Sequence, residues 1–300
     1  MSEAQLSKGN LFDPELVTKV INKVKGHSSI AKLSPQKPIP FNGQKEFIFD
    51  FDSDIDIVAE NGKKTHGGVS LEPVTIVPLK IEYGARVSDE FLHASEEAKV
   101  DMLTDYVEGF SKKLARGLDI MSIHGINPRT KQASTIIGDN CFDKKVTQTV
   151  PFKDTNPDES MEDAVGMIDG SERDITGAIL DPIFTTALSK MKNAEGGKLY
   201  PELAWGGVPD AINGLAVDKN RTVSYSQTDP KNTAIVGDFE TMFKWGYAKE
   251  VPMEIIKYGD PDNSGRDLKG YNQIYIRCEA YLGWGIMDAA SFARIVKTGG

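Results

Sequence analysis

The chain has 300 residues, of which 39% are hydrophobic and 26% are charged, and its formal net charge is −9. This composition is typical of a soluble globular protein with one large domain or two smaller ones, and the acidic balance argues against a primary nucleic-acid binder, which would carry a basic face. The sequence contains neither the run of about 18 apolar residues that a membrane helix needs nor the start of a signal peptide.

Residues 1–45 are predicted to form an extended arm that contains one short helix. Asp13 and Pro14 match a capping residue followed by proline at the first helical position, and Gly26 ends the apolar stripe that follows. Three prolines between residues 35 and 40 favour an extended chain after the helix. Because such an arm has little core of its own, it is either a disordered terminus or a strap that packs on a neighbour.

Residues 46–85 are predicted to form a long two-stranded hairpin. Apolar and acidic side chains alternate from residue 47 to residue 57, which places the two kinds on opposite faces of a strand. A turn is expected over residues 60–64 and a return strand over about residues 70–83. An isolated ribbon of two strands is only marginally stable in water. A hairpin this long and polar therefore needs something outside itself to lie on, which indicates self-assembly.

The turn of this hairpin is the predicted inter-subunit contact. Its candidate residues are Glu60, Asn61, Gly62, Lys63, Lys64 and His66. Lysines in a tight turn are normally solvated, but at an interface Lys63 and Lys64 would be candidate salt-bridge partners for the acidic surface of another subunit. Pro73 and Pro78 fall in the return strand, where proline is tolerated only at an edge or a bulge.

A long amphipathic helix is predicted after the hairpin. Ser95 is its expected N-cap, and two glutamates directly after it lie at the positive end of the helix. Seven apolar residues then form one continuous stripe at helical spacing. They are Val100, Leu103, Val107, Phe110, Leu114, Leu118 and Met121. Gly125 and Pro128 mark the end of the helix.

The rest of the chain is predicted to be mixed α/β and then β. The expected elements are helices over residues 157–168 and 182–192 and strands over 177–180, 214–217, 233–236, 251–257 and 271–282. A turn is expected over residues 259–265. The last of these strands alternates cleanly, and its apolar face consists of Ile274, Ile276, Cys278, Ala280 and Leu282.

No motif in the chain carries a complete catalytic or ligand-binding pattern. The acidic run over residues 52–56 resembles the start of a calcium loop, but Ile57 stands where glycine is required and Lys63 where the final glutamate is required. Asp119 and His124 flank the end of the long helix. A polar helix end is favoured over a catalytic pair at this place.

Histidine and cysteine give no sign of a reactive site. The four histidines are scattered, without a metal-binding pair at helical spacing. Cys141 and Cys278 are far apart, which indicates free thiols in a reducing compartment rather than a disulfide. We therefore predict no catalytic, cofactor-binding or metal-ligating residue and no enzyme. A hydrolase or metal-dependent enzyme of mixed fold is the remote alternative, which metal analysis of the purified protein would test.

The order of these elements resembles the major capsid protein of tailed bacteriophages, the Hong Kong phage capsid fold. Three stretches carry the resemblance. They are residues 57–92, similar to the extended loop and its return; 114–128, similar to the end of the spine helix; and 236–239 with 275–277 and 288–292, similar to the closing sheet and last segment.

The resemblance implies an α+β fold with four parts. These are an N-terminal arm (1–45), an extended hairpin loop (46–85), a peripheral domain with the spine helix and a β-sheet (86–132 and 235–300), and a mixed α/β axial domain (133–234). It implies subunits that form hexamers and pentamers of an icosahedral shell around a double-stranded DNA genome. The shell would be that of a virion, assembled in the bacterial host cytoplasm.

The implied partners are other copies of the chain, a separate scaffolding protein and a portal. DNA would be enclosed without sequence-specific binding, and no membrane is involved. An encapsulin, whose similar shell holds enzymes, is the alternative within this fold, and a co-purified cargo enzyme would favour it. Some relatives crosslink loop lysines to asparagines, but neither an acceptor nor a catalytic acid can be matched here, so crosslinking is not predicted.

Overall fold

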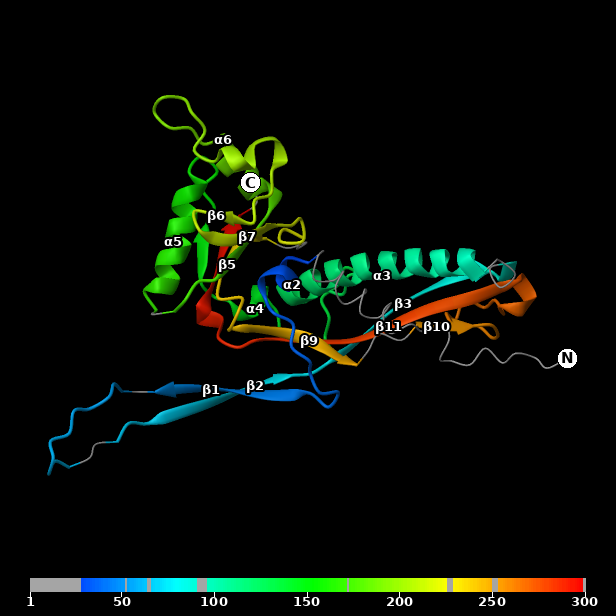
Figure 1. Ribbon diagram of the computed structural model, residues 1–300, viewed down its shortest axis with the longest axis horizontal. Helices are drawn as coiled ribbons and strands as arrows, with labels where there is room; N and C mark the ends of the chain where they lie inside the picture. Colours follow the sequence, from blue (N-terminus) through cyan, green and yellow to red (C-terminus); the bar gives the residue numbers. More distant parts are fainter. Residues whose placement is uncertain are drawn as a thin grey trace.

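Three β-sheets, one of them a projecting two-stranded hairpin, and several helices make up the part of the chain that the structure describes (Figure 1). The computed structural model describes residues 28–51, 53–63, 66–90, 96–171, 173–225, 229–249 and 253–298. The predicted helix that begins at Pro14 and the predicted cap Ser95 lie outside these residues. The mixed helices and sheets confirm the predicted α+β class.

The described part of the arm packs on its own chain. Ser28 caps the short helix α2 (Ser29–Leu33) by accepting a hydrogen bond from the amide of Ala31. Residues 36–39 then run beside strand β9 (Phe243–Lys249), where the amide of Lys37 donates to the carbonyl of Trp245 at 2.9 Å. This segment therefore packs on the surface of its own subunit, and the packing of the arm on a neighbour stays a prediction.

The hairpin consists of strands β1 (Gln44–Phe51) and β2 (Val69–Ile76), which pair antiparallel. The predicted first strand was too long, because the chain loses strand structure after Phe51. Among the sheets of the described residues, none covers the isoleucine face of residues 53–57, and serine and aspartate favour turns over strands because their side chains can bond to nearby backbone groups. Pro73 lies inside β2, opposite Phe47, as an edge strand allows.

The predicted return strand is in fact two strands in two different sheets. β2 ends at Ile76, and β3 (Leu79–Ser88) begins after Pro78. A proline has no amide hydrogen to donate to a ladder, so the chain changes partners at this point. β3 pairs antiparallel with the long strand β11 (Gln273–Ile286), from Leu79 opposite Leu282 to Ser88 opposite Gln273. The hairpin is thus continuous with the body of the molecule.

The long helix α3 (Glu96–His124) lies along one face of the sheet formed by β3, β9, β10 (Met253–Ile256) and β11 (Figure 1). The predicted stripe from Leu103 to Met121 is buried, while the side chain of Val100 lies outside the described part. The stripe packs on the apolar face of β11 that begins at Ile274, as the alternation predicted. Burial of this shared face holds helix and sheet together.

A second sheet of six strands has the order β4-β12-β8-β5-β7-β6. Its strands are β4 (Thr149–Pro151), β5 (Gly177–Leu180), β6 (Ala211–Ile212), β7 (Leu215–Lys219), β8 (Lys231–Gly237) and β12 (Phe292–Lys297). The helices that pack with it are α4 (Phe142–Lys145), α5 (Pro157–Asp169) and α6 (Pro182–Lys190). The last strand, β12, lies between β4 and β8 in this sheet, although the sequence groups it with the spine helix.

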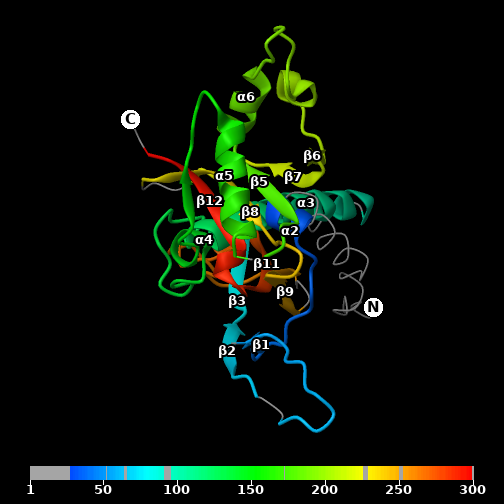
Figure 2. The same ribbon diagram turned by 90° about the vertical axis from the view of Figure 1, so that its left-hand side faces the viewer.

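Three short 3-10 helices complete the described elements. They are η2 (Pro201–Gly206), η3 (Lys269–Tyr271) and η4 (Ala289–Ser291). The hairpin loop and the α6 end lie at opposite ends of the molecule (Figure 2).

Candidate functional site

The tip of the hairpin is exposed and lies away from the rest of the molecule in both views (Figures 1 and 2). The amide of Gly62 donates to the carbonyl of Ala59 at 2.8 Å, which closes a turn at Glu60 and Asn61. The described candidates at this turn, together with His66, have exposed side chains or backbone. Lys64 lies outside the described residues. The turn is thus where the sequence predicts it.

Apolar side chains project from the same loop into solvent. Ile55 is 98% exposed, Ile57 is 96% exposed, and Val58 is partly exposed. Large contiguous exposed apolar patches are typical of interaction sites, and these three residues lie within four positions of one loop. Burying one isoleucine side chain is worth about 1.5–3 kcal/mol. The sequence pattern predicts these isoleucines on one face of a strand and does not predict them as contact residues. Their alternation with aspartates is the signal that could have identified them.

The base of the hairpin, in contrast, is fixed to the body. Ile76 at the end of β2 is buried against Ile39 and Met287. A Cβ atom built on Gly285 would lie 2.9 Å from Cγ1 of Ile76, so a glycine at this position lets β11 approach the hairpin closely. Lys244 also forms an ion pair with Glu46 at 2.7 Å. The hairpin is therefore held at its base while its loop is exposed.

Asp119 ties two segments to the end of α3. It accepts hydrogen bonds from the hydroxyl of Ser28, the backbone amides of Ser29 and Ile30, Nδ2 of Asn220 and Oγ1 of Thr222. Burial raises the pKa of Asp119 to about 6, and the hydrogen bonds oppose that rise. The carboxyl group fixes α2 and the loop after β7 to the long helix.

His124 has partners different from those of Asp119. Its Nδ1 lies 2.7 Å from Oδ2 of Asp143, and its Nε2 lies 2.8 Å from the carbonyl oxygen of Thr222. Both ring nitrogens of His124 therefore have an oxygen neighbour. Burial would raise the pKa of Asp143, but hydrogen bonding to His124 is the leading cause that lowers it below its usual value. Asp119 and His124 therefore contact different segments at the polar end of the helix, and Thr222 contacts both.

A second exposed apolar surface lies at the end of the molecule opposite the hairpin, near α6 (Figure 2). Trp205 is wholly exposed, and its backbone has a left-handed φ of 57°. This conformation costs a bulky residue about 1–2 kcal/mol. Val208 in the same loop and Ile183 on α6 are also exposed. Strain of this kind is typical of functional surfaces, and no sequence pattern predicts it at this position.

Two searches of the described residues give negative findings. Among the helices of this part, none is long and apolar enough to cross a bilayer. Within the same residues, no group of three or more His, Cys, Asp or Glu side chains is arranged to hold a metal ion. Cys141 and Cys278 are both buried and free, and burial raises the pKa of each thiol.

Comparison with known proteins gives a consistent result. The family model described as "Phage capsid family" matches residues 8–297. A structure from Mycobacterium phage Ogopogo is 30% identical, with a TM-score of 0.77 over 91% of this chain and 92% of the other. A structure from Gordonia phage Cozz is 22% identical, with a TM-score of 0.74 over 91% and 87%.

The capsid of an empty GTA particle shares the fold at 14% identity, with a TM-score of 0.66 over 91% of this chain and 90% of the other. The search of curated proteins finds no match. These findings point to a structural protein and not to an enzyme. The chain therefore belongs to the phage capsid family and is a major capsid protein.

Proposed function

We propose that this chain forms hexamers and pentamers of an icosahedral shell around the double-stranded DNA of a tailed phage, and that the hairpin loop makes a principal contact between subunits. The observation that carries the proposal is the pair Ile55 and Ile57, almost fully exposed on a loop whose base is anchored. A fixed base reduces the entropy that the loop loses when it docks on a neighbour.

The charged turn complements this apolar contact. Lys63 sits at the tip of a subunit whose net charge is −9, so the acidic surface of a neighbour attracts it, and Glu60 offers the opposite charge beside it. Surface ion pairs each contribute little, roughly 0–1 kcal/mol. We therefore propose that the turn residues orient the loop on its neighbour, and that the isoleucines contribute most of the binding free energy.

The proposed division of the chain follows the sequence prediction with one change. The arm is 1–45, the hairpin loop 46–85, the peripheral part 86–132 with 235–291, and the axial part 133–234 together with β12. β12 joins the axial part because it pairs with β4 and β8. A separate scaffolding protein, a portal and assembly in the host cytoplasm belong to the same proposal.

The acidic balance of the chain supports a container that does not bind DNA by sequence. A net charge of −9 repels a polyanion over the scale of the whole subunit. Negative-stain microscopy of the purified protein tests the proposed assembly. Closed shells or capsomers are expected under some condition of salt and crowding, and a protein that stays monomeric under all of them would contradict the proposal.

The contact itself is tested with Ile55→Ser and Ile57→Ser in one chain. Loss of two buried side chains should raise the protein concentration needed for assembly at least about tenfold, since about 1.4 kcal/mol corresponds to tenfold. Light scattering against concentration measures this threshold. Ile136→Ser is the matched control, because Ile136 is 80% exposed on a loop outside the hairpin, and an equal effect in both variants would refute the assignment.

A further inference from the structure

The loop between β10 and β11 has the sequence pattern of a calcium-binding loop. Residues 260–265 read Asp-Pro-Asp-Asn-Ser-Gly, with oxygen-bearing side chains at the first, third and fifth positions and glycine at the sixth. The seventh position of such a loop contributes its backbone carbonyl, which here belongs to Arg266. The twelfth position is Tyr271 and lacks the usual glutamate.

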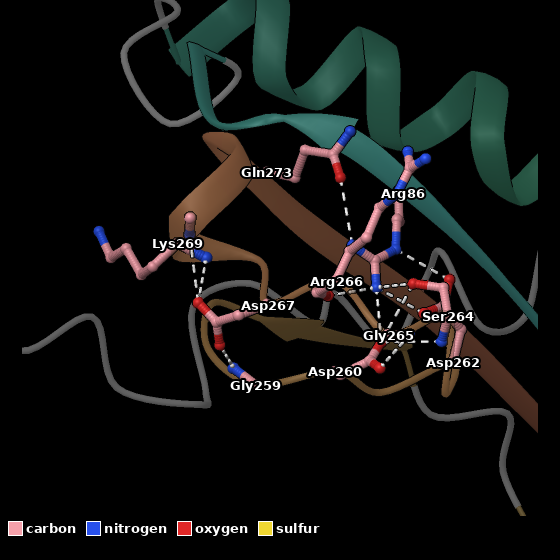
Figure 3. Close-up of polar contacts among 11 residues, drawn as sticks. Arg86, Gly259, Asp260, Asp262, Ser264, Gly265, Arg266, Asp267, Lys269 and Gln273 are labelled. Atoms are coloured by element: carbon pink, nitrogen blue, oxygen red, sulfur yellow. Dashed lines mark hydrogen bonds and ion pairs between the residues drawn. The ribbon is translucent and has the colours of Figure 1, made fainter.

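A side chain from another strand occupies the centre of this loop (Figure 3). Arg86 of β3 places its Nη2 at 2.7 Å from Oδ1 of Asp260, 2.6 Å from Oδ1 of Asp262, 2.6 Å from Oγ of Ser264 and 2.8 Å from the carbonyl oxygen of Arg266. These four oxygens are the ligands that the first, third, fifth and seventh positions offer to a cation. One guanidinium nitrogen thus lies where calcium would bind.

The number of oxygen atoms around Nη2 indicates that this nitrogen occupies a cation-binding position. Ordinary hydrogen bonding would need fewer oxygen neighbours. Nη2 carries two hydrogens, but it has four oxygen neighbours within 2.8 Å. The rest of the guanidinium is held as well, because Nε donates to Oδ2 of Asp262 at 2.9 Å and Nη1 donates to Gln273 at 3.3 Å. The hydrogen bond from Arg86 is the leading cause that holds the pKa of Asp262 well below its usual value.

The backbone of the loop is folded around the same centre. The amide of Gly265 donates to Oδ2 of Asp260 at 2.7 Å, and the amide of Ser264 donates to Oδ1 of Asp260 at 3.0 Å. Gly265 has a φ of 78°, in the left-handed region that favours glycine. Asp267 then accepts from the amides of Gly259 and Lys269 at 3.2 and 2.9 Å, which closes the loop at both ends.

We propose that residues 260–267 form a calcium-type loop in which the guanidinium of Arg86 replaces the metal ion. The guanidinium carries its charge at every physiological pH, so the loop is latched to β3 without a divalent cation. Removing that guanidinium should open a site for calcium, formed by the carboxylates of Asp260 and Asp262, the hydroxyl of Ser264 and the carbonyl of Arg266. This inference does not depend on the proposed assembly function.

Hydrogen exchange of the loop amides in the full-length protein tests this inference. In the wild type, exchange at residues 259–267 should be equal in millimolar calcium and in a chelator. In Arg86→Met with the chelator, exchange should be about tenfold faster, because the loop opens locally. Calcium should restore protection in this variant, magnesium should restore less because it prefers a smaller octahedral site, and Arg86→Met with Asp262→Asn should not respond to calcium.

Arg277→Met is the matched control, since it removes a guanidinium of the same sheet that pairs with Glu254 and Glu279 and not with the residues of the loop. Should Arg86→Met fail to fold, Arg86→Lys replaces it: a lysine ammonium is a compact cation, so this variant should protect the loop without calcium. Three results would overturn the inference. They are calcium-dependent protection in the wild type, unchanged protection in Arg86→Met with a chelator, or no response of that variant to calcium.

Discussion

At the scale of single residues, neighbours in sequence have separate partners in space. Asp119 and His124 lie one turn apart at the end of α3, yet Asp119 holds α2 and the loop after β7, while His124 holds α4 through Asp143. Both reach Thr222, one through its hydroxyl and the other through its carbonyl. The end of the long helix is therefore a polar junction of several segments.

Asp119 gives the fold a defined pH dependence. Its folded-state pKa of about 6 is above the ordinary 3.8, so the folded state binds the proton more strongly than the unfolded chain. Protonated Asp119 therefore stabilises the folded state, and this stabilisation is fully present below about pH 4. It is lost as the pH rises through about 6, which lowers the free energy of unfolding by on the order of 3 kcal/mol. Asp119→Asn should lack this change.

Denaturant unfolding of wild type and Asp119→Asn at several pH values between about 4 and 7 checks the prediction. The contributions of other titrating groups cancel when the unfolding free energy of Asp119→Asn is subtracted from that of the wild type. A difference that stays constant across this range would show that the carboxyl group does not titrate as described.

At the scale of elements, amphipathic segments with a local partner were predictable. The apolar stripe of α3 and the alternating apolar face of β11 bury each other. Each sequence pattern therefore corresponds to a packing contact within the subunit. The hairpin was predicted too long because nothing covers Ile55 and Ile57 within one subunit. The break at Pro78 could have been recognised from the missing amide, but the change to a second sheet depends on β11, which is about 200 residues away.

The packing of the arm on β9 depends on a glycine. A Cβ atom on Gly246 would lie 1.7 Å from the carbonyl oxygen of Lys37. Gly246→Ala should therefore displace residues 36–39 from β9 and lower the unfolding free energy of the unassembled subunit by about 1–3 kcal/mol. Thermal or denaturant unfolding measures the loss, and proteolysis within the arm should become faster.

Gly109→Ala is the matched control for this prediction. Gly109 is an exposed position in the middle of α3, and no heavy atom lies within 4 Å of a Cβ built there. Alanine should stabilise the helix by about 0.5–1 kcal/mol. If Gly246→Ala were as stable as Gly109→Ala, the arm would not need the close approach to β9.

At the scale of the whole molecule, the described part of the chain is a body from which a hairpin loop projects, with the side chains of Ile55 and Ile57 almost fully exposed. The family and the order of elements were predictable from the sequence, whereas two features of its surfaces were not. The calcium-loop pattern of residues 260–265 depends on Arg86, which occupies its centre from a strand that is distant in the sequence. Trp205 became a candidate contact only from its exposure and backbone conformation.

The most direct test of the account replaces residues 53–67, which include Ile55, Ile57 and the turn, with a short turn. Because β1 and β2 pair from Gln44 to Phe51 and the base is anchored by Ile76, the monomer should keep its fold, with an unchanged circular dichroism spectrum and unfolding midpoint. Microscopy of the same sample should find shell formation impaired. A folded variant that assembles into shells as the wild type does would contradict the central claim that the hairpin loop is an assembly device.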